Sequence, residues 1–265
     1  MRRRQLLGAL AAALAGGRLT ASWALEGAMP AIARHFSVVG TISPRAGPVG
    51  QGFSAVQVAP RWAVTAAHIA PAAGWVFASD SGLSGIVEVL TFPSSAPTRS
   101  PIEGVPRDDI ALLRLGRAIS SPYYPRLADD SYLAPILRTA PMATLVSNNP
   151  GLKERRFGFV HLEFLKEVAG YSLAIATGLD GAGSAHGAYV VPGDSGSPVF
   201  MGHLLNSSEA SILVGIASSE IVDHAGGRHS VYSRVGAVRG QLDEAVRSNA
   251  ETLRWAAGAQ QPSLP

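Results

Sequence analysis

Short apolar runs rich in Val, Ile and Ala alternate with clusters of Gly and Pro through the first half of the chain. Runs of this length between turn-forming residues predict β-strands rather than helices. The predicted strands span residues 36–43, 52–60, 61–67, 85–92 and 110–115. A polar, Pro-rich loop over 93–106 separates the last two of them. This half therefore contains enough strand-forming sequence for one six-stranded barrel.

The second half repeats the pattern and favours a second barrel. Its predicted strands span 142–147, 155–165, 171–177, 197–201, 210–219 and 229–235. Between the halves, residues 118–135 are rich in Pro and Tyr and lack periodicity, so we expect them to connect two lobes.

The period changes after Gly236, because Leu242, Val246, Leu253 and Trp255 lie within helical reach of one broad face. Such spacing predicts a closing amphipathic helix. The expected organisation is a barrel lobe at 25–125, a second lobe at 126–239, a helix at 240–257 and a frayed tail at 258–265.

Composition adds two limits to this picture. Of 265 residues, 47% are hydrophobic and 15% charged, which excludes a largely disordered chain. There are no cysteines, so packing must hold the fold without disulfides, and zinc sites of the cysteine type are excluded. No metal-binding spacing such as HExxH is present, and we interpret His186, His203 and His224 as surface residues rather than ligands.

The first 24 residues are typical of an export signal. Three arginines precede an Ala- and Gly-rich apolar run, and Arg3-Arg4 resembles the twin-arginine type. We predict cleavage after Ala24 and a periplasmic or extracellular protein; the alternative is an uncleaved membrane anchor. Cleavage removes four arginines and no acid, which takes the formal charge from +3 to −1. The mature chain therefore offers no basic patch for nucleic acid, and we expect no membrane contact after signal removal.

Three polar motifs point to nucleophilic chemistry. TAAH ends at His68, Asp109 directly precedes the apolar run 110–115, and GDSGSP surrounds Ser195. A serine hydroxyl is a weak nucleophile that needs a base and a group to orient that base. The order His, Asp, Ser fits neither the α/β-hydrolases nor the subtilisin-like enzymes, and Ser197 breaks the GxSxG pattern.

TAAH, DIALL and GDSGSP in this order resemble the motifs of the trypsin/chymotrypsin-like serine proteases. The likeness extends to LVGIAS (213–218) and SVYSRV (230–235) and covers roughly 36–254. The resemblance implies an all-β fold of two six-stranded antiparallel β-barrels, with the active site in the cleft between them and a C-terminal α-helix. It further implies a monomeric serine endopeptidase that acts on a polypeptide through an acyl-enzyme intermediate and needs no cofactor.

The resemblance also assigns roles to individual residues. His68 would be the general base, Asp109 would orient it, and Ser195 would attack the substrate. The backbone N–H groups of Gly193 and Ser195 would form the oxyanion hole, and Ser218 would support the buried aspartate. Taken singly, a core histidine, a loop carboxylate and a turn hydroxyl remain alternative interpretations of the three main residues. Asp108 is the competing carboxylate, which we interpret as a solvated neighbour.

The chain departs from the family's pattern in two places. Tyr189 and Val190 lie where the family forms the floor of its primary pocket, and Ser219 and Glu220 replace the usual Trp-Gly at the pocket entrance. No activation site stands out, so we expect internal groups to satisfy Asp194 without an activating cleavage. Two other functions stay open: a secreted binding module with the same fold, and an esterase or transferase using the same acyl chemistry.

Overall fold

The computed structural model describes ten segments of the chain. They are residues 29–30, 34–45, 52–92, 109–139, 141–148, 155–163, 173–177, 190–202, 211–222 and 228–256. All statements below concern these residues.

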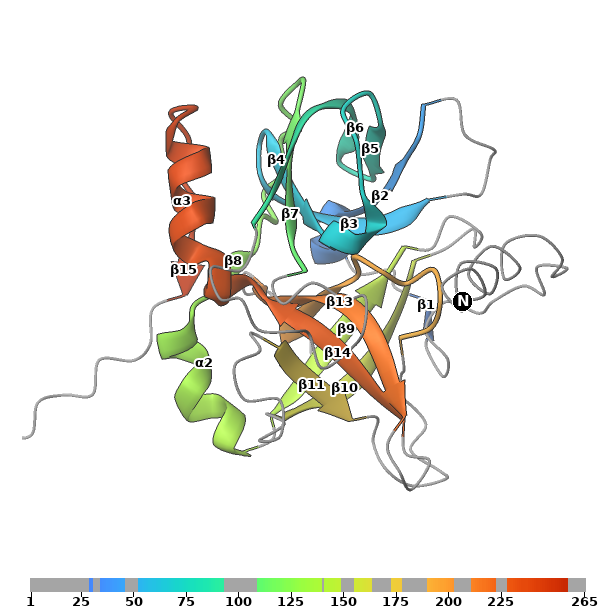
Figure 1. The fold of residues 1–265 in the computed structure, drawn as a ribbon, viewed down its shortest axis with the longest axis vertical. Coiled ribbons are helices and arrows are strands. Elements are labelled where there is room, and N and C mark those ends of the chain that lie inside the picture. The colour runs from blue at the N-terminus through green and yellow to red at the C-terminus, as the bar shows by residue number, and fades with distance from the viewer. Residues whose placement is uncertain are drawn as a thin grey trace, which may run out of the picture.

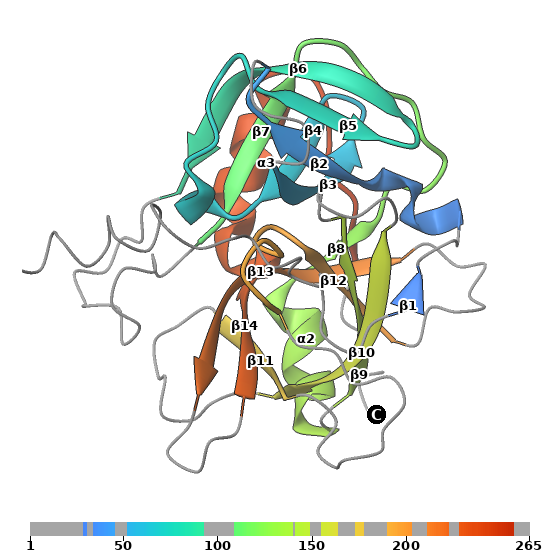
Figure 2. The same cartoon turned by 90° about the vertical axis from the view of Figure 1, so that its right-hand side faces the viewer.

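The first half forms a closed antiparallel barrel with the strand order β2-β3-β4-β7-β6-β5 (Figure 2). Its strands are β2 (Val39–Ser43), β3 (Phe53–Ala59), β4 (Trp62–Thr65), β5 (Val76–Ser79), β6 (Gly82–Thr91) and β7 (Ala111–Leu115). The prediction of a six-stranded barrel here is confirmed. Two details differ: residues 34–38 form a 3-10 helix before β2, and β5 was not predicted because its short run lies between Gly74 and Gly82.

The second half forms a nine-stranded sheet with the main order β12-β9-β10-β11-β14-β13-β8-β15. In chain order its strands are β1 (Met29–Pro30), β8 (Arg126–Ala128), β9 (Met142–Ser147), β10 (Arg156–Glu163), β11 (Leu173–Thr177), β12 (Pro198–Met201), β13 (Ile212–Val222), β14 (Arg228–Arg234) and β15 (Trp255–Ala256). Strand β1 pairs with β10, and β12 pairs with β13 as well as with β9. All pairings are antiparallel except those that β8 makes with β13 and β15.

The connection between the halves is more ordered than predicted. It contains β8 and then α2 (Asp130–Ile136), which continues into a 3-10 helix at Leu137–Thr139. The Asp129 side chain caps α2 by accepting a hydrogen bond from the Tyr132 N–H. An N-terminal cap of this kind stabilises the start of a short helix even where the apolar periodicity does not predict one.

The C-terminal helix exists but is shorter than predicted. A 3-10 turn (Val235–Val238) leads into α3, which ends at Arg247 rather than near 257. The side chains of Ser248 and Asn249 both donate to the Ala245 carbonyl, and Ala250 adopts φ 59°. This left-handed residue turns the chain out of the helix, so that β15 can pair with β8.

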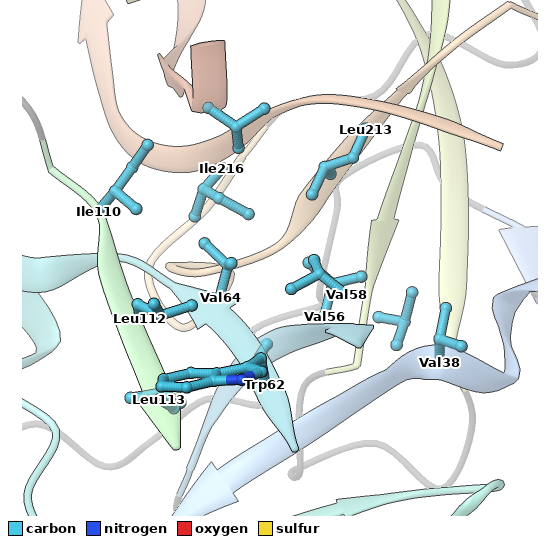
Figure 3. Close-up of a cluster of buried hydrophobic side chains, with 14 of the residues drawn as sticks. Val38, Val56, Val58, Trp62, Val64, Ile110, Leu112, Leu113, Leu213 and Ile216 are labelled. Atoms are coloured by element: carbon cyan, nitrogen blue, oxygen red, sulfur yellow. The ribbon is translucent and has the colours of Figure 1, made fainter. Parts of the chain in front are cut away.

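One hydrophobic cluster spans both halves, and a second cluster lies within the second half. The buried cluster that contains Trp62 of the barrel also contains Leu213 and Ile216 of β13 and Leu242 and Val246 of α3. Figure 3 shows Leu213 and Ile216 reaching the valines of β3 and β4, and α3 lies beside the barrel in Figure 1. Two elements therefore pack on the half to which they do not belong in sequence. Strand β1 precedes the barrel but joins the second sheet, and α3 follows the second sheet but packs on the barrel.

None of the helices in the described part of the chain combines the length and apolar character that crossing a bilayer requires.

Candidate active site

His68 lies on a short 3-10 turn, Ala67–Ile69, directly after β4. Ile69 is buried and anchors the turn, and Ala70 closes it with φ 51° in the left-handed region. The imidazole side chain stays 29% exposed, so a bound molecule can reach it from solvent. The local fold therefore presents this histidine at the surface of an otherwise buried strand end.

Asp109 lies just before β7 and is fully buried. Its Oδ1 accepts a hydrogen bond from the His68 backbone N–H at 2.7 Å, and its Oδ2 lies 2.6 Å from His68 Nδ1. The second sheet supplies two further contacts: Ser218 Oγ donates to Oδ2 at 2.5 Å, and the Asp109 N–H donates to Ser233 Oγ at 3.1 Å. A buried carboxylate needs such donors to offset its lost hydration. Both halves of the molecule thus hold this side chain.

Ser195 lies in the turn before β12, and its Oγ is 2.9 Å from His68 Nε2. The three predicted residues are therefore brought into one hydrogen-bonded chain, although they come from two different halves. A carboxylate only accepts hydrogen bonds, so His68 Nδ1 carries the proton toward Asp109. The Nε2 lone pair then faces the Ser195 hydroxyl. This arrangement can withdraw a proton from that hydroxyl and stabilise the resulting imidazolium.

Glycine is required at position 196, where the turn packs directly on the barrel. Gly196 has φ 84°, and a Cβ there would lie 2.0 Å from the Ser54 carbonyl oxygen. The Ser54 N–H donates to the Ser195 carbonyl at 3.1 Å, and Thr65 Oγ1 donates to the Ser54 carbonyl at 2.7 Å. These contacts with strand β3 thus fix the position of the serine turn relative to His68.

The two backbone N–H groups predicted for the oxyanion hole keep their hydrogen-bonding capacity. Within the part of the chain that the structure describes, neither the Gly193 nor the Ser195 N–H donates a hydrogen bond. Gly193 has φ 102°, a conformation that strongly favours glycine. Both groups are therefore available to an acceptor on a bound molecule.

Asp194 is fully buried between these two residues. Its Oδ1 accepts a hydrogen bond from Ser147 Oγ at 2.6 Å, and its Oδ2 accepts one from the Val191 N–H at 2.9 Å. The structure thus provides internal donors to this carboxylate, in line with the expectation that internal groups satisfy it.

The residues predicted to form a specificity pocket are only partly described. Val190 is buried, and its N–H donates to Ser230 Oγ at 2.9 Å. Ser219 and Glu220 are half-buried on β13, opposite Val231 and Ser230 of β14. Tyr189, Asp108 and the histidines at 186, 203 and 224 lie outside the described residues.

Three serines at the site were not singled out from the sequence: Ser54, Ser147 and Ser233. Each is fully buried on an apolar strand. A buried hydroxyl needs a hydrogen-bond partner, so polar residues inside strongly apolar runs are the signal that could have identified them. Their partners lie on distant segments, which periodicity does not predict.

Among the described residues, no group of three or more His, Cys, Asp or Glu side chains is arranged to hold a metal ion. No protein-family model and no curated protein matches this sequence. The function must therefore be inferred from the residues of the site.

Proposed function

We propose that this protein is an exported serine endopeptidase of the trypsin/chymotrypsin-like class. The observation that carries the proposal is the chain of contacts from Asp109 Oδ2 to His68 Nδ1 at 2.6 Å and from His68 Nε2 to Ser195 Oγ at 2.9 Å. Residues 127 positions apart meet here at hydrogen-bonding distance. A carboxylate that orients an imidazole, and an imidazole that faces a hydroxyl, are the contacts that activate a serine for acyl transfer.

In the proposed reaction, Ser195 Oγ attacks the carbonyl carbon of the scissile peptide bond, and its proton passes to His68 Nε2. The substrate oxygen becomes negative and accepts hydrogen bonds from the Gly193 and Ser195 N–H groups. Each such donor lowers the barrier by about 3 kcal/mol. When the C–N bond breaks, the proton on Nε2 passes to the leaving amine, and the acyl group remains on Oγ.

Water then completes the cycle. It gives a proton to His68 Nε2 and attacks the acyl carbon, and the ester bond breaks as that proton returns to Ser195 Oγ. Throughout, Asp109 holds the imidazole in one tautomer and stabilises its positive form. All groups in these steps belong to the chain or to the substrate and water.

We further propose that the second sheet contains a second six-stranded barrel. The support is the pairing of β12 with both β9 and β13, because the order β12-β9-β10-β11-β14-β13 then returns to its first strand. Register shifts between Val199 and Phe200 and between Ala217 and Ser219 support the same closure. Irregularities of this kind increase local bending and twist.

Export is proposed from the first 24 residues alone, which lie outside the described part of the chain. The arginines followed by a short apolar run support it. A chain without cysteines is compatible with an oxidising compartment such as the periplasm.

The proposal is tested with the mature protein and a fluorophosphonate probe. The wild type should become labelled on Ser195, whereas Ser195→Ala should not label and His68→Ala should label far more slowly. Ser211→Ala is the matched control, since it removes a buried serine hydroxyl with no hydrogen-bond partner in the described part of the chain. An unlabelled wild type would favour a binding module without catalysis. Labelled protein that cleaves small esters but no denatured polypeptide would favour an esterase or transferase.

A further inference from the structure

The carboxylate of Asp194 links the serine turn to the end of strand β9. Ser147 Oγ donates to Asp194 Oδ1 at 2.6 Å across 47 residues of sequence, and both side chains are fully buried. Within the turn, the Asp194 N–H donates to the Val191 carbonyl at 3.0 Å, and the Asp194 carbonyl accepts from the Ser197 N–H at 2.9 Å. Any movement of this carboxylate therefore moves the backbone on both sides of it.

Strand β9 is itself firmly held. It pairs with β10 along its full length and with β12 over three residues. The next residue, Asn148, donates its N–H to Ser54 Oγ at 3.0 Å, and the Ser54 N–H donates to the Ser195 carbonyl at 3.1 Å. Two successive residues of this strand end thus hold two successive residues of the serine turn. Ser147 reaches Asp194 directly, and Asn148 reaches Ser195 through Ser54.

We propose that Ser147 is a positioning residue, whose hydroxyl orients the Gly193 and Ser195 N–H groups through the Asp194 carboxylate. The inference rests on the proposed function and adds to it that the turn is held by the chain's own hydroxyl, without any cleavage of the chain. The physical reason is the cost of burying a carboxylate. Removal of the Ser147 hydroxyl takes one hydrogen-bond donor from a buried carboxylate, which costs free energy, and a shift of the carboxylate and its turn lowers that cost.

The kinetic test compares Ser147→Ala with Ser197→Ala in the mature protein. Ser197 is also fully buried and lies two residues from the nucleophile, but its Oγ has no hydrogen-bond partner among the described residues. We expect Ser147→Ala to lower kcat by about tenfold or more, since removing one oxyanion donor costs about 10²–10³ in kcat. KM should change by less than about twofold, because the N–H groups act mainly on the charged transition state. Ser197→Ala should keep the wild-type kcat.

Two further measurements separate positioning from general damage. Ser147→Thr keeps the hydroxyl and should recover most of the lost kcat. The pH dependence of kcat/KM should keep its wild-type midpoint in Ser147→Ala, because the contact between His68 and Asp109 does not involve Ser147. A shifted midpoint, or equal losses in the Ala and Thr variants, would contradict the proposal.

Hydrogen exchange of the Asp194 amide, whose N–H donates to the Val191 carbonyl at 3.0 Å, gives a readout that needs no activity. Exchange should be at least about tenfold faster in Ser147→Ala than in Ser197→Ala, with unchanged exchange in the barrel strands. If the wild type neither labels nor cleaves but this difference is found, the proposed function fails and the positioning role stands. If the wild type is active and Ser147→Ala matches Ser197→Ala in kcat and exchange, the positioning role is wrong.

Discussion

At the scale of single residues, the carboxylate of Asp109 shows how one buried group can order a site. Both of its oxygens accept hydrogen bonds, from His68 and from Ser218, and its own N–H donates to Ser233 Oγ. The donors come from opposite halves of the molecule, so the carboxylate has a single position when both halves are folded. Its negative charge then selects the His68 tautomer that leaves Nε2 facing Ser195.

Replacing Asp109 by Asn should therefore disable the site with little change in its shape. At the Oδ2 position the amide NH₂ would donate to His68 Nδ1 and favour the other tautomer, whereas at the Oδ1 position it would oppose the His68 backbone N–H. A change of this kind in a Ser-His-Asp triad lowers kcat by about 10⁴. The measurement is kcat of Asp109→Asn beside Asp108→Asn, which we expect to retain wild-type turnover. The opposite ranking would transfer the role to Asp108.

At the scale of elements, one carboxylate joins helices α2 and α3. Asp129 caps α2 through the Tyr132 N–H and also pairs with Arg239 at the start of α3. The Arg239 guanidinium lies 4.8 Å from the centre of the Trp255 ring, and Trp255 Nε1 donates to Asp243 at 2.8 Å. The start of α3 and strand β15 are thereby fixed to the connection between the halves.

We expect this junction to lower the free energy of unfolding as the pH falls into the acid range. Burial alone would raise the pKa of Asp129, but hydrogen bonds from Ser131 and Tyr132 and the charge of Arg239 outweigh it, and the pKa is lowered. A lowered pKa contributes stability above the ordinary value near 4, and that stability is lost as the pH falls through the folded-state pKa. Asp129→Asn keeps a capping side chain but removes the charge.

Thermal unfolding checks this expectation. The midpoint of Asp129→Asn should lie below that of the wild type at pH 7, and the gap should shrink as the pH falls below about 4. Asp130→Asn is the control: its carboxylate is 51% exposed and pairs with Arg234 at 3.1 Å, so its effect should be small at both pH values. A difference between the two unfolding midpoints that stays constant with pH would show that the charge of Asp129 does not contribute to stability.

At the scale of the whole molecule, the barrel and the second sheet are not independent units. The hydrophobic cluster of the barrel continues into β13 and α3 (Figures 1 and 3). Strand β1, which precedes the barrel in sequence, pairs with β10 of the second sheet. The site depends on this arrangement, because Asp109 and Ser54 belong to the barrel while Ser218 and Ser195 belong to the second half. Separation of the halves would break those contacts together.

We therefore expect a protein that starts at residue 25 to unfold in a single transition. Denaturation in urea followed by tryptophan fluorescence should coincide with denaturation followed by far-UV circular dichroism. Trp62 reports on the barrel core and Trp255 on strand β15 of the second sheet, so the fluorescence samples both halves. Two resolved transitions would show that the halves fold separately despite their shared core.

Local chemistry made several features predictable from the sequence: the first barrel, the existence of the C-terminal helix, and the three motifs that carry His68, Asp109 and Ser195. Alternation of apolar runs and turn residues is a short-range property, and the motifs lie directly at strand ends, so neither needs knowledge of distant contacts. The end of α3 was less predictable, because the competing hydrogen bonds of Ser248 and Asn249 do not alter the apolar period.

Only the tertiary structure decided which buried serines serve the site. Ser54, Ser147 and Ser233 resemble any other small polar residue on an apolar strand, and their partners lie on segments far away in the chain. The close approach of Gly196 to the Ser54 carbonyl likewise exists only once the two halves pack. Sequence periodicity specifies which face of a strand is buried, whereas the pairing of one buried hydroxyl with one buried carboxylate is set by the register and packing of whole sheets.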